Sequence, residues 1–370
     1  MAAVAALEAA PRLRRLLGSP LARALTTPHG VDRYLELVQP TWSLREVRAG
    51  VVAIRHETAD SITLTLRPNR AWRGFEAGQH VRLTVEIAGV RRTRCYSPAG
   101  SARATGGHLE LTVKAHPHGL VSGFLNNHAD VGMVVGLSQA EGDFTLPEQR
   151  PEHLLLISGG SGITPVMSML RTLCDEGHAG RVTFLHYAFT EGDVIYGREL
   201  SELAAQHPNL SLVRAYTDSD GGELHGLFSR DHLSAAVAGH ELAETYVCGP
   251  PGLMDAVAAT WEHDGIADRL HVERFTPPAF TPSSEDARGT VMFAGCGVEA
   301  ANSGRPLLEQ AEAAGLRPEH GCRMGICRTC TRRKLAGSVR NLQTGQLSGP
   351  YDEDIQLCVS VPVGDVAVDL

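Results

Sequence analysis

The stretch GCRMGICRTC, residues 321–330, places three of the chain's eight cysteines within nine positions. The spacing is Cys322-x4-Cys327-x2-Cys330, and Cys358 follows after 27 further residues. Four thiolates at this spacing are typical of a plant-type [2Fe-2S] cluster, and the two glycines let the backbone wrap around inorganic sulfurs. The alternatives are a zinc site, which usually has two C-x2-C pairs, and a loop of buried core cysteines. Because only one such pair is present, we interpret the stretch as a cluster site.

The composition is that of a globular protein with more than one domain. The 370 residues are 43% apolar and 21% charged, and a net charge of −8 argues against nucleic-acid binding. No apolar run reaches the roughly 18 residues of a membrane span, and Glu8 interrupts the opening run, so we expect neither a membrane helix nor a secretory signal. The other cysteines that we weighed are isolated, which predicts a reducing cytoplasm rather than disulfides: Cys95, Cys174, Cys248 and Cys296.

Four blocks of different pattern divide the chain. Residues 1–46 are rich in Ala, Leu and Arg and predict a helical extension. Residues 47–148 hold short alternating strands such as SITLTLRP, HVRLTVEIAG and HLELTVKAH, which indicate a β-barrel. In 149–280, apolar runs such as HLLLIS and RVTFLHYAF alternate with helical stretches, as in a parallel α/β sheet. A proline-rich linker at 276–289 leads into 281–370, a separate unit with the cysteine loop.

Two places in the barrel block suit a phosphate-bearing flat heterocycle. Arg94-Cys95-Tyr96-Ser97 ends a predicted strand, and alternation puts a guanidinium and an aromatic ring on one side of it. Further on, Val113 and Lys114 end a strand, and a helix is predicted to begin at the GLVS stretch, residues 119–122, where its N-terminus would seat a phosphate. Each pattern alone fits an ordinary surface or core equally well.

Two turns in the α/β block suit a dinucleotide. The strand HLLLIS is followed by GGSGITP, residues 159–165, and then by a helix predicted from Val166. Strand, glycine turn and helix is the dinucleotide arrangement, although the G-x-G-x-x-P match lacks the usual last glycine. A later strand ends in Cys248-Gly249-Pro250, at the carboxyl edge where ligands of such sheets bind. A plain βα turn and a core cysteine are the alternatives.

Taken together and in this order, R-x-Y-S, G-x-x-S, GGSGITP, CGP and C-x4-C-x2-C resemble the ferredoxin–NADP reductase superfamily over about residues 47–370. More narrowly, the chain is similar to the three-domain members that serve as reductase components of oxygenases, hydroxylases and acyl-lipid desaturases. The resemblance implies a multi-domain fold: a β-barrel flavin domain, a Rossmann-like α/β nicotinamide domain and a C-terminal β-grasp ferredoxin domain. It implies FAD, a [2Fe-2S] cluster and NADPH or NADH as cofactors. WSLREV, RCYSPAG, HYAFT and CRMGIC look most like reductases of membrane acyl-CoA desaturases.

The same resemblance implies roles for matching positions. Around the flavin it implies the phosphate contact, the ring face and the N5 side for Arg94, Tyr96 and Ser97, a flavin border for Val113 and Lys114, and the pyrophosphate seat for Gly119, Leu120, Val121 and Ser122. Around the nicotinamide nucleotide it implies Gly160, Gly162, Thr164, Pro165, Cys248 and Gly249, with Glu273 and Phe275 of VERF closing the domain near the flavin. The residues expected nearest the reacting atoms are Ser97, Thr164, Cys248 and Glu273. The expected iron ligands are Cys322, Cys327, Cys330 and Cys358.

Two departures from the family pattern bear on specificity. After the second parallel strand, Phe189 stands where relatives often carry arginine, Glu191 and Asp193 would disfavour a 2′-phosphate, and Arg198 would favour one. NADH against NADPH therefore stays open. The cluster loop is basic through Arg328, Arg332, Arg333 and Lys334, although 281–370 carries nine basic and eleven acidic residues, which suggests an acceptor with acidic groups unless these are ordinary solvated arginines.

We therefore predict an NAD(P)H-dependent reductase that passes electrons through FAD and [2Fe-2S] to an external protein. The favoured acceptor is a membrane acyl-CoA or fatty-acid desaturase or hydroxylase, and the alternatives are a soluble ring-hydroxylating oxygenase and a redox sensor without turnover. The segment PRLRRLLGSPLARAL, residues 11–25, has helical leucine spacing and arginines, so we weigh a peripheral contact with the inner face of the membrane against packing on the barrel.

Overall fold

The computed structural model describes residues 19, 24, 26–27, 30–44, 46–117, 119–237, 239–275, 287–321, 323–325 and 328–370. Most of the leucine- and arginine-rich segment 11–25, most of the linker at 276–289, and the cysteines Cys322 and Cys327 therefore fall outside the described residues. The chain forms two compact units, described in turn: the described residues of 1–91 with 96–145 and 167–177, and then 92–95, 146–166 and the described residues of 178–370.

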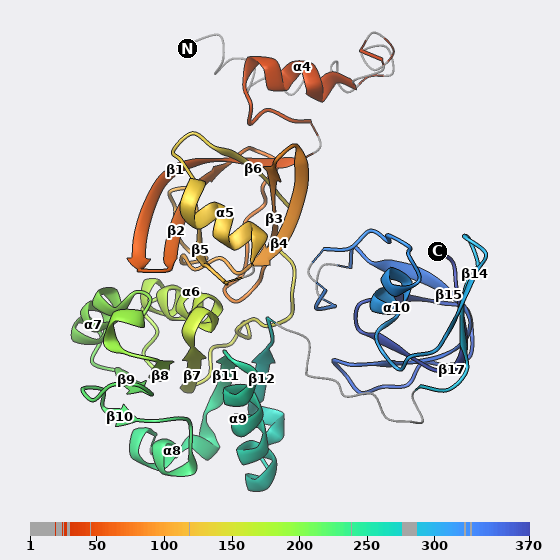
Figure 1. Ribbon diagram of the computed structural model, residues 1–370. Helices are drawn as coiled ribbons and strands as arrows, with labels where there is room; N and C mark the ends of the chain where they lie inside the picture. Colours follow the sequence, from red (N-terminus) through yellow and green to blue (C-terminus); the bar gives the residue numbers. More distant parts are fainter. Residues whose placement is uncertain are drawn as a thin grey trace. The chain divides into compact units, whose positions relative to one another are not determined.

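The first unit is built on a six-stranded antiparallel sheet that curls into a barrel, with strand order β4-β3-β6-β1-β2-β5 (Figure 1). Beyond the last residue of β4, Pro98 bridges Leu111 of β5, so the two edges of the sheet meet there. This closure is how antiparallel sheets remove their exposed edges. The elements are α4 (Gly30–Val38), β1 (Val47–Thr58), β2 (Ser61–Pro68), β3 (Val81–Ile87), β4 (Val90–Tyr96), β5 (Leu109–Lys114), α5 (Leu120–His128) and β6 (Val134–Leu137).

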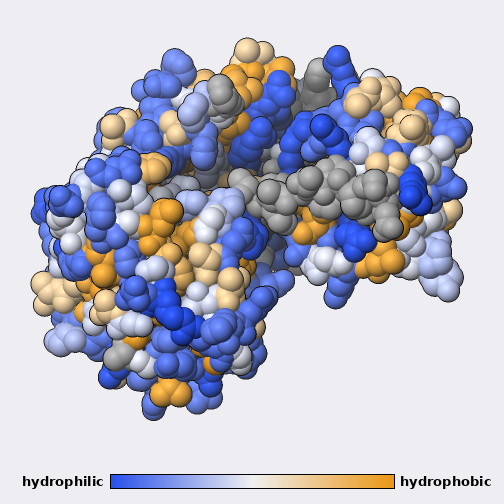
Figure 2. Space-filling view, turned by 60° about the horizontal axis from the view of Figure 1, so that its bottom comes forward, coloured by the Kyte–Doolittle hydropathy of each residue, from blue (hydrophilic) through white to orange (hydrophobic). Residues whose placement is uncertain are grey.

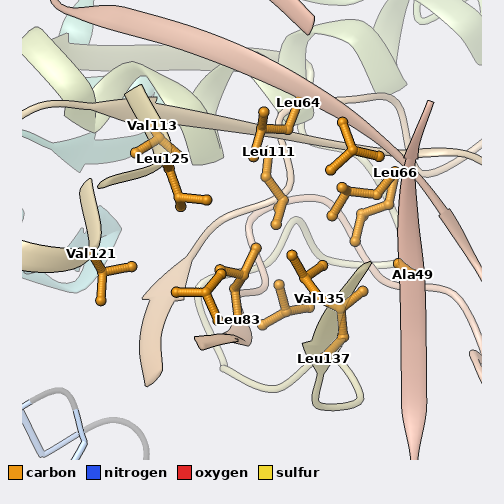
Figure 3. Close-up of a cluster of buried hydrophobic side chains, with 14 of the residues drawn as sticks. Ala49, Leu64, Leu66, Leu83, Leu111, Val113, Val121, Leu125, Val135 and Leu137 are labelled. Carbon is orange, nitrogen blue, oxygen red and sulfur yellow. The ribbon is translucent and has the colours of Figure 1, made fainter. Parts of the chain in front are cut away.

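The alternating sequences of these strands explain the barrel core. In β2, Ile62, Leu64 and Leu66 are at most 1% exposed because every second side chain points inward. Figure 3 shows aliphatic side chains from β1, β2, β3, β5 and β6 converging with Val121 and Leu125 of α5. The predicted barrel is confirmed, and α5 lies where a helix was predicted after the fifth strand.

The described part of the N-terminal extension is tied to this barrel. Glu36 of α4 pairs with Arg48 of β1 at 2.6 Å, and Asn69 donates to the carbonyl of Thr41 at 3.0 Å. These bonds join residues 30–44 to the barrel wall, so this stretch is part of the first unit. Residues 167–177 also belong to that unit, where Arg171 donates to the carbonyl of Ala99 at 2.7 Å.

The second unit begins with a parallel six-stranded sheet in the order β10-β9-β8-β7-β11-β12. One face buries Ile157, Leu185 and Val247 against Leu233 of α8 and Trp261 of α9. The elements are β7 (His153–Gly159), η1 (Gly160–Gly162), α6 (Ile163–Asp175), β8 (Arg181–Ala188), η2 (Glu191–Asp193), α7 (Gly197–Gln206), β9 (Leu210–Tyr216), β10 (Leu224–His225), α8 (Arg230–Ala236), η3 (His240–Leu242), β11 (Glu244–Cys248), α9 (Pro251–Asp264), η4 (Ala267–Arg269) and β12 (Leu270–Glu273). The predicted α/β sheet with crossover helices is confirmed.

A five-stranded mixed sheet, in the order β14-β13-β17-β15-β16, forms the C-terminal domain. Only the β13–β17 pair is parallel, and α10 buries Leu307 and Leu308 against the sheet. This is the predicted β-grasp arrangement. The elements are β13 (Thr290–Phe293), β14 (Val298–Ala301), α10 (Leu307–Ala313), β15 (Thr331–Asn341), β16 (Glu353–Gln356) and β17 (Ser360–Val368).

The surface carries no large apolar belt on the face that Figure 2 shows, where hydrophilic residues predominate and hydrophobic ones lie among them. Among the helices of the described residues, none combines the length and the apolar character that crossing a bilayer requires.

Candidate cofactor sites

The end of β4 fits the flavin side of the predicted chemistry. Tyr96 is half-buried against the barrel core, and Ser97 is 2% exposed. The hydroxyl oxygen of Ser97 has no hydrogen-bond partner among the described residues. An unsatisfied buried hydroxyl costs about 1–3 kcal/mol, and a bound polar group would remove that cost. Ser97 therefore fits a residue that hydrogen-bonds a flavin, as the resemblance implies.

Arg94, two residues earlier on the same strand, has an exposed side chain. Its guanidinium donates to the carbonyl of Thr93 at 2.8 Å and forms no ion pair within the described part of the chain. An arginine without a carboxylate partner has its charge available for phosphate oxygens. The position suits the predicted pyrophosphate contact.

The first turn of α5 is closed by Ser122. Its hydroxyl accepts from the N–H of His116 and donates to the carbonyl of Gly119, each at 3.3 Å. A Cβ atom at Gly119 would lie 2.2 Å from that hydroxyl, so the turn requires glycine. Val121 is 1% exposed in the barrel core, whereas Leu120 is 50% exposed. Backbone N–H groups at the start of α5, rather than the apolar side chains, are thus the groups that fit a phosphate.

Val113 and Lys114 differ in what they offer a ligand. Val113 lies in the barrel core with 0% exposure, so only its backbone can border a cofactor. Lys114 pairs with Asp60 at 2.7 Å. Burial alone would raise the pKa of Asp60, but hydrogen bonds from Lys114, Thr58 and Ser61 hold that pKa below its ordinary value. The charge of Lys114 is therefore already balanced by Asp60, a partner that sequence reasoning did not find.

The glycines of the β7–α6 turn differ in why glycine stands at each position. A Cβ atom at Gly162 would lie 2.2 Å from the carbonyl oxygen of Cys248, and one at Gly159 would lie 2.7 Å from the Pro250 ring. These two glycines are required because the turn packs directly on the CGP turn after β11. Gly160 has φ +52° and no atom within 4 Å of its missing Cβ position. Gly160 therefore has open space beside it, and its predicted contact with a dinucleotide stays a prediction.

The helix after this turn starts earlier than predicted, at Ile163 instead of Val166. Thr164 and Pro165 therefore lie in the first helical turn, where proline needs no hydrogen bond from its nitrogen. Thr164 is 4% exposed, and its hydroxyl donates to the carbonyl of Ser161 at 3.2 Å. The structure gives Thr164 a local role in the turn, and its predicted place near the nicotinamide stays a prediction.

Cys248 and Glu273 are brought together at the carboxyl end of the sheet, where they pair in register on β11 and β12. Burial raises the pKa of Glu273 to about 8, so its carboxyl group is mostly protonated at neutral pH. Burial, followed by the nearby Glu273, raises the pKa of the Cys248 thiol well above its ordinary value. The pair thus presents two neutral groups, a thiol and a carboxylic acid. Phe275, half-buried, lies two residues beyond the strand.

Sequence reasoning missed two more polar residues that lie beside Cys248 across the neighbouring strands. Ser158 pairs in register with Cys248 on one side and with His186 on the other. The Ser158 hydroxyl lies 2.8 Å from Nδ1 of His186, and both residues are 0% exposed. Burial lowers the pKa of His186 to about 3, so the ring is neutral at physiological pH. The sequence could have indicated them, since Ser158 and His186 are polar residues within the otherwise apolar runs HLLLIS and RVTFLH.

The cluster loop brings two predicted iron ligands into the C-terminal core. Cys330 is 2% and Cys358 5% exposed, and the N–H of Leu357 donates to the carbonyl of Cys330 at 3.2 Å. The N–H of Gly325 donates to the Cys358 sulfur at 3.2 Å. Amide hydrogen bonds to cysteine sulfur are typical of iron–sulfur sites. No group of three metal-binding side chains gathers among the described residues, since Cys322 and Cys327 are outside them.

The backbone of this loop is left-handed at three described residues, Arg323 (φ +59°), Gly325 (+73°) and Arg328 (+53°). A Cβ atom at Gly325 would lie 2.8 Å from the Gln343 side chain and 2.9 Å from Val359. Gly325 is thus required both by its φ and by its neighbours. Left-handed residues of this kind are common in backbone loops that bind anions, which fits an anionic cluster.

Comparisons with known proteins give a flavin, a nicotinamide and an iron–sulfur domain in this order along the chain. Residues 50–146 match the family model of an oxidoreductase FAD-binding domain, 156–259 that of an oxidoreductase NAD-binding domain, and 292–363 that of a 2Fe-2S iron-sulfur cluster binding domain. An NADPH oxidoreductase of Mycobacterium tuberculosis is 38% identical over 354 residues, which covers 95% of this chain and 91% of that protein. The glycine betaine monooxygenase reductase subunit of Chromohalobacter salexigens is 30% identical and covers 80% of this chain and 87% of that protein.

Solved structures share the fold. Phthalate dioxygenase reductase, described as modular for electron transfer from pyridine nucleotides to [2Fe-2S], aligns with a TM-score of 0.59 at 24% identity, covering 87% of this chain and 97% of that one. The FAD/NAD-binding domain of nitric oxide dioxygenase from Vibrio cholerae aligns with a TM-score of 0.57 at 28% identity, covering 63% of this chain and 100% of that one.

Proposed function

The chain is a three-domain member of the ferredoxin–NADP reductase superfamily, with FAD, nicotinamide and [2Fe-2S] domains, and on this premise we propose that it delivers electrons from NADPH to an oxygen-activating enzyme. It is an oxidoreductase that carries electrons from NAD(P)H through FAD to [2Fe-2S]. The observation that carries the proposal is the presence of all three domains in one chain, since a two-electron donor, a flavin and a one-electron cluster form a complete relay.

The residues of the chain hold and orient the reactants in this proposal. When bound, FAD takes two electrons from the nicotinamide and can release them singly. Ser97 supplies the hydroxyl that hydrogen-bonds the flavin edge, and Arg94 supplies a cation for its pyrophosphate. Cys248 and Glu273 present neutral groups at the nicotinamide site, and the Glu273 carboxyl group keeps its proton at neutral pH. Four cysteines hold the cluster, of which Cys330 and Cys358 are buried in the ferredoxin domain.

The acceptor we propose is an enzyme that activates oxygen and consumes electrons one at a time. Relatives of this chain are named as the reductase subunit of glycine betaine monooxygenase and the reductase component of propane 2-monooxygenase. These names support an oxygenase. A membrane desaturase or hydroxylase, which the sequence favours, belongs to the same chemical class and stays a prediction.

NADPH is the donor we propose. The Mycobacterium tuberculosis relative, 38% identical to this chain, is named an NADPH oxidoreductase. In addition, the Asp193 carboxylate accepts from the N–H and the hydroxyl of Thr190, at 3.1 and 2.7 Å. These two bonds orient the carboxylate within its own turn but leave its charge in place, so the choice of NADPH rests on the named relative.

Anaerobic reduction of the purified holoprotein tests the proposal. We expect NADPH to bleach the flavin and then the cluster absorbance, and to do so at lower concentration than NADH. Addition of an oxygenase component in one arm, and of a membrane desaturase in detergent in another, should restore the oxidised spectrum in whichever arm holds the acceptor. Flavin that stays oxidised with both coenzymes would overturn the proposed function.

A further inference from the structure

The cations around the cluster loop fall into two groups. Arg323 pairs with Glu312 at 2.9 Å, and Arg333 pairs with Asp352 at 2.6 Å. Lys334 is 0% exposed, pairs with Glu353 at 3.0 Å and donates to three backbone carbonyls. These three charges are balanced inside the domain, so the sequence overstates how basic the loop is.

Arg328 and Arg332 form the other group. Neither makes an ion pair with a carboxylate in the part of the chain that the structure describes. The Arg328 side chain is exposed, and Arg332, the second residue of β15, donates to the carbonyl of Thr331 at 2.7 Å. Each is two residues from Cys330, which puts its Cα within about 7 Å of the cysteine Cα. Just before the loop, Glu319 is exposed and carries the opposite charge.

The backbone of Arg328 is in a left-handed conformation that favours glycine. Its φ of +53° is one that glycine adopts freely and a side chain with a Cβ adopts at a cost. No side-chain bond or ion pair of Arg328 inside the described fold offsets this cost. The guanidinium is therefore directed to solvent beside the cluster with its charge unbalanced.

We propose that Arg328 and Arg332, which we call the basic rim, are the docking contacts for an acidic patch on the protein that takes electrons from the cluster. This inference rests on the proposed function and names the chemistry of its partner. Charges of opposite sign around two redox centres steer the encounter and hold the centres close, and salt screens this attraction. The partner is thus an acceptor protein with carboxylates around its own redox centre.

Two one-electron acceptor proteins of opposite charge test the basic rim on the holoprotein. Cytochrome b5, which is anionic, and cytochrome c, which is cationic, are each reduced by NADPH through the enzyme at low and at high salt. For Arg328→Glu with Arg332→Glu we expect the second-order rate with cytochrome b5 to fall about tenfold at low salt, and the rate with cytochrome c to rise. High salt should bring wild type and variant together.

Two further variants separate charge from fold. Arg328→Gly removes the charge and suits the left-handed backbone, so it should melt no lower than wild type and still lose part of the cytochrome b5 rate. Arg305→Glu changes an exposed arginine elsewhere in the domain, 66% exposed and paired with Glu309, and should leave both rates unchanged.

The outcomes separate this inference from the proposed function. If wild type reduces both cytochromes and the charge reversal slows or leaves both alike, the basic rim is wrong and the relay stands. An equal effect of Arg305→Glu would also overturn the rim, because net charge alone would then explain the rates. If NADPH fails to reduce the flavin of the wild type, the proposed function itself has failed.

Discussion

The turn after β7 and the loop around the cluster are both glycine-bearing loops, and they are held in different ways. Gly159 and Gly162 are required because other atoms already occupy the space, with the Pro250 ring 2.7 Å from a Cβ at Gly159 and the Cys248 carbonyl 2.2 Å from one at Gly162. In the cluster loop the left-handed residues include two arginines, Arg323 and Arg328, which adopt that region at a cost.

This difference predicts how each site depends on its ligand. The nicotinamide turn is shaped by close packing within the sheet, so the protein alone determines its conformation. The described residues of the cluster loop are held by hydrogen bonds instead, such as the Gly325 N–H on the Cys358 sulfur and the Gln343 side chain on the Met324 carbonyl. We infer that ligation by iron supplies much of the stability of the cluster loop, as in other metal-coupled folds.

Gly162→Val should have the largest effect, because it forces branched carbons into the Cys248 carbonyl. We expect a loss of at least about 1–3 kcal/mol, the range of overpacked cores, together with loss of flavin reduction by NADPH. Thermal unfolding and stopped-flow flavin absorbance measure the two effects. Gly160→Ala is the matched control for stability, since its Cβ would meet open space and only the φ of +52° opposes it. Equal loss of stability in both variants would mean that backbone conformation, not packing, determines the need for glycine.

Cys358→Ser should remove the cluster and leave the flavin half of the relay working. Serine oxygen is a poor substitute for a thiolate ligand, and the loop would lose the sulfur that Gly325 contacts. We expect the cluster absorbance and cytochrome c reduction to disappear, while NADPH still reduces FAD at a rate within about twofold of wild type. Cys296→Ser, an exposed cysteine, is the control and should keep both. A full cluster spectrum in Cys358→Ser would refute the ligand assignment.

Glu273→Gln tests whether the buried Glu273 carboxyl group is protonated, through the pH dependence of stability. The pKa of Glu273 is about 8 in the folded protein and about 4.5 when solvated, so between these values the folded state holds a proton that the unfolded state releases. Wild type should therefore lose stability as pH rises from about 5 to 8 and lose no more above that from this group. Relative to Glu273→Gln, we expect its melting temperature to fall by about 8–16 °C over this range, because three pH units at 1.36 kcal/mol each amount to about 4 kcal/mol. Parallel melting curves for the two proteins would show that Glu273 is ionised at pH 5.

Much of the fold followed from periodicity, and much less of the site did. The strand SITLTLRP matches β2 to the residue, and HLLLIS lacks only the last residue of β7, since alternation and buried apolar runs record which face meets the core. Sequence letters carry no such record of partners distant along the chain. The pairing of Lys114 with Asp60, and of Ser158 with His186, depends on strand register, which a single strand does not encode. The helix predicted from Val166 starts at Ile163, because proline fits the first helical turn as well as it fits the turn before a helix.

The smallest effect is expected at Arg198 in the nicotinamide domain. Unlike the two arginines of the basic rim, it has a carboxylate partner among the described residues. Its side chain is 92% exposed and paired with Glu202 at 2.7 Å, and it lies in the first turn of α7. An exposed arginine that already has a carboxylate partner contributes little to binding a phosphate. Arg198→Ala should therefore raise the KM for NADPH by about two- to fivefold and leave the KM for NADH and both kcat values unchanged. Glu202→Ala, which releases the same guanidinium, should lower the KM for NADPH if Arg198 meets the 2′-phosphate. Unchanged KM values in both variants would place the 2′-phosphate away from Arg198, and the preference for NADPH would then depend on other residues of the turn after β8.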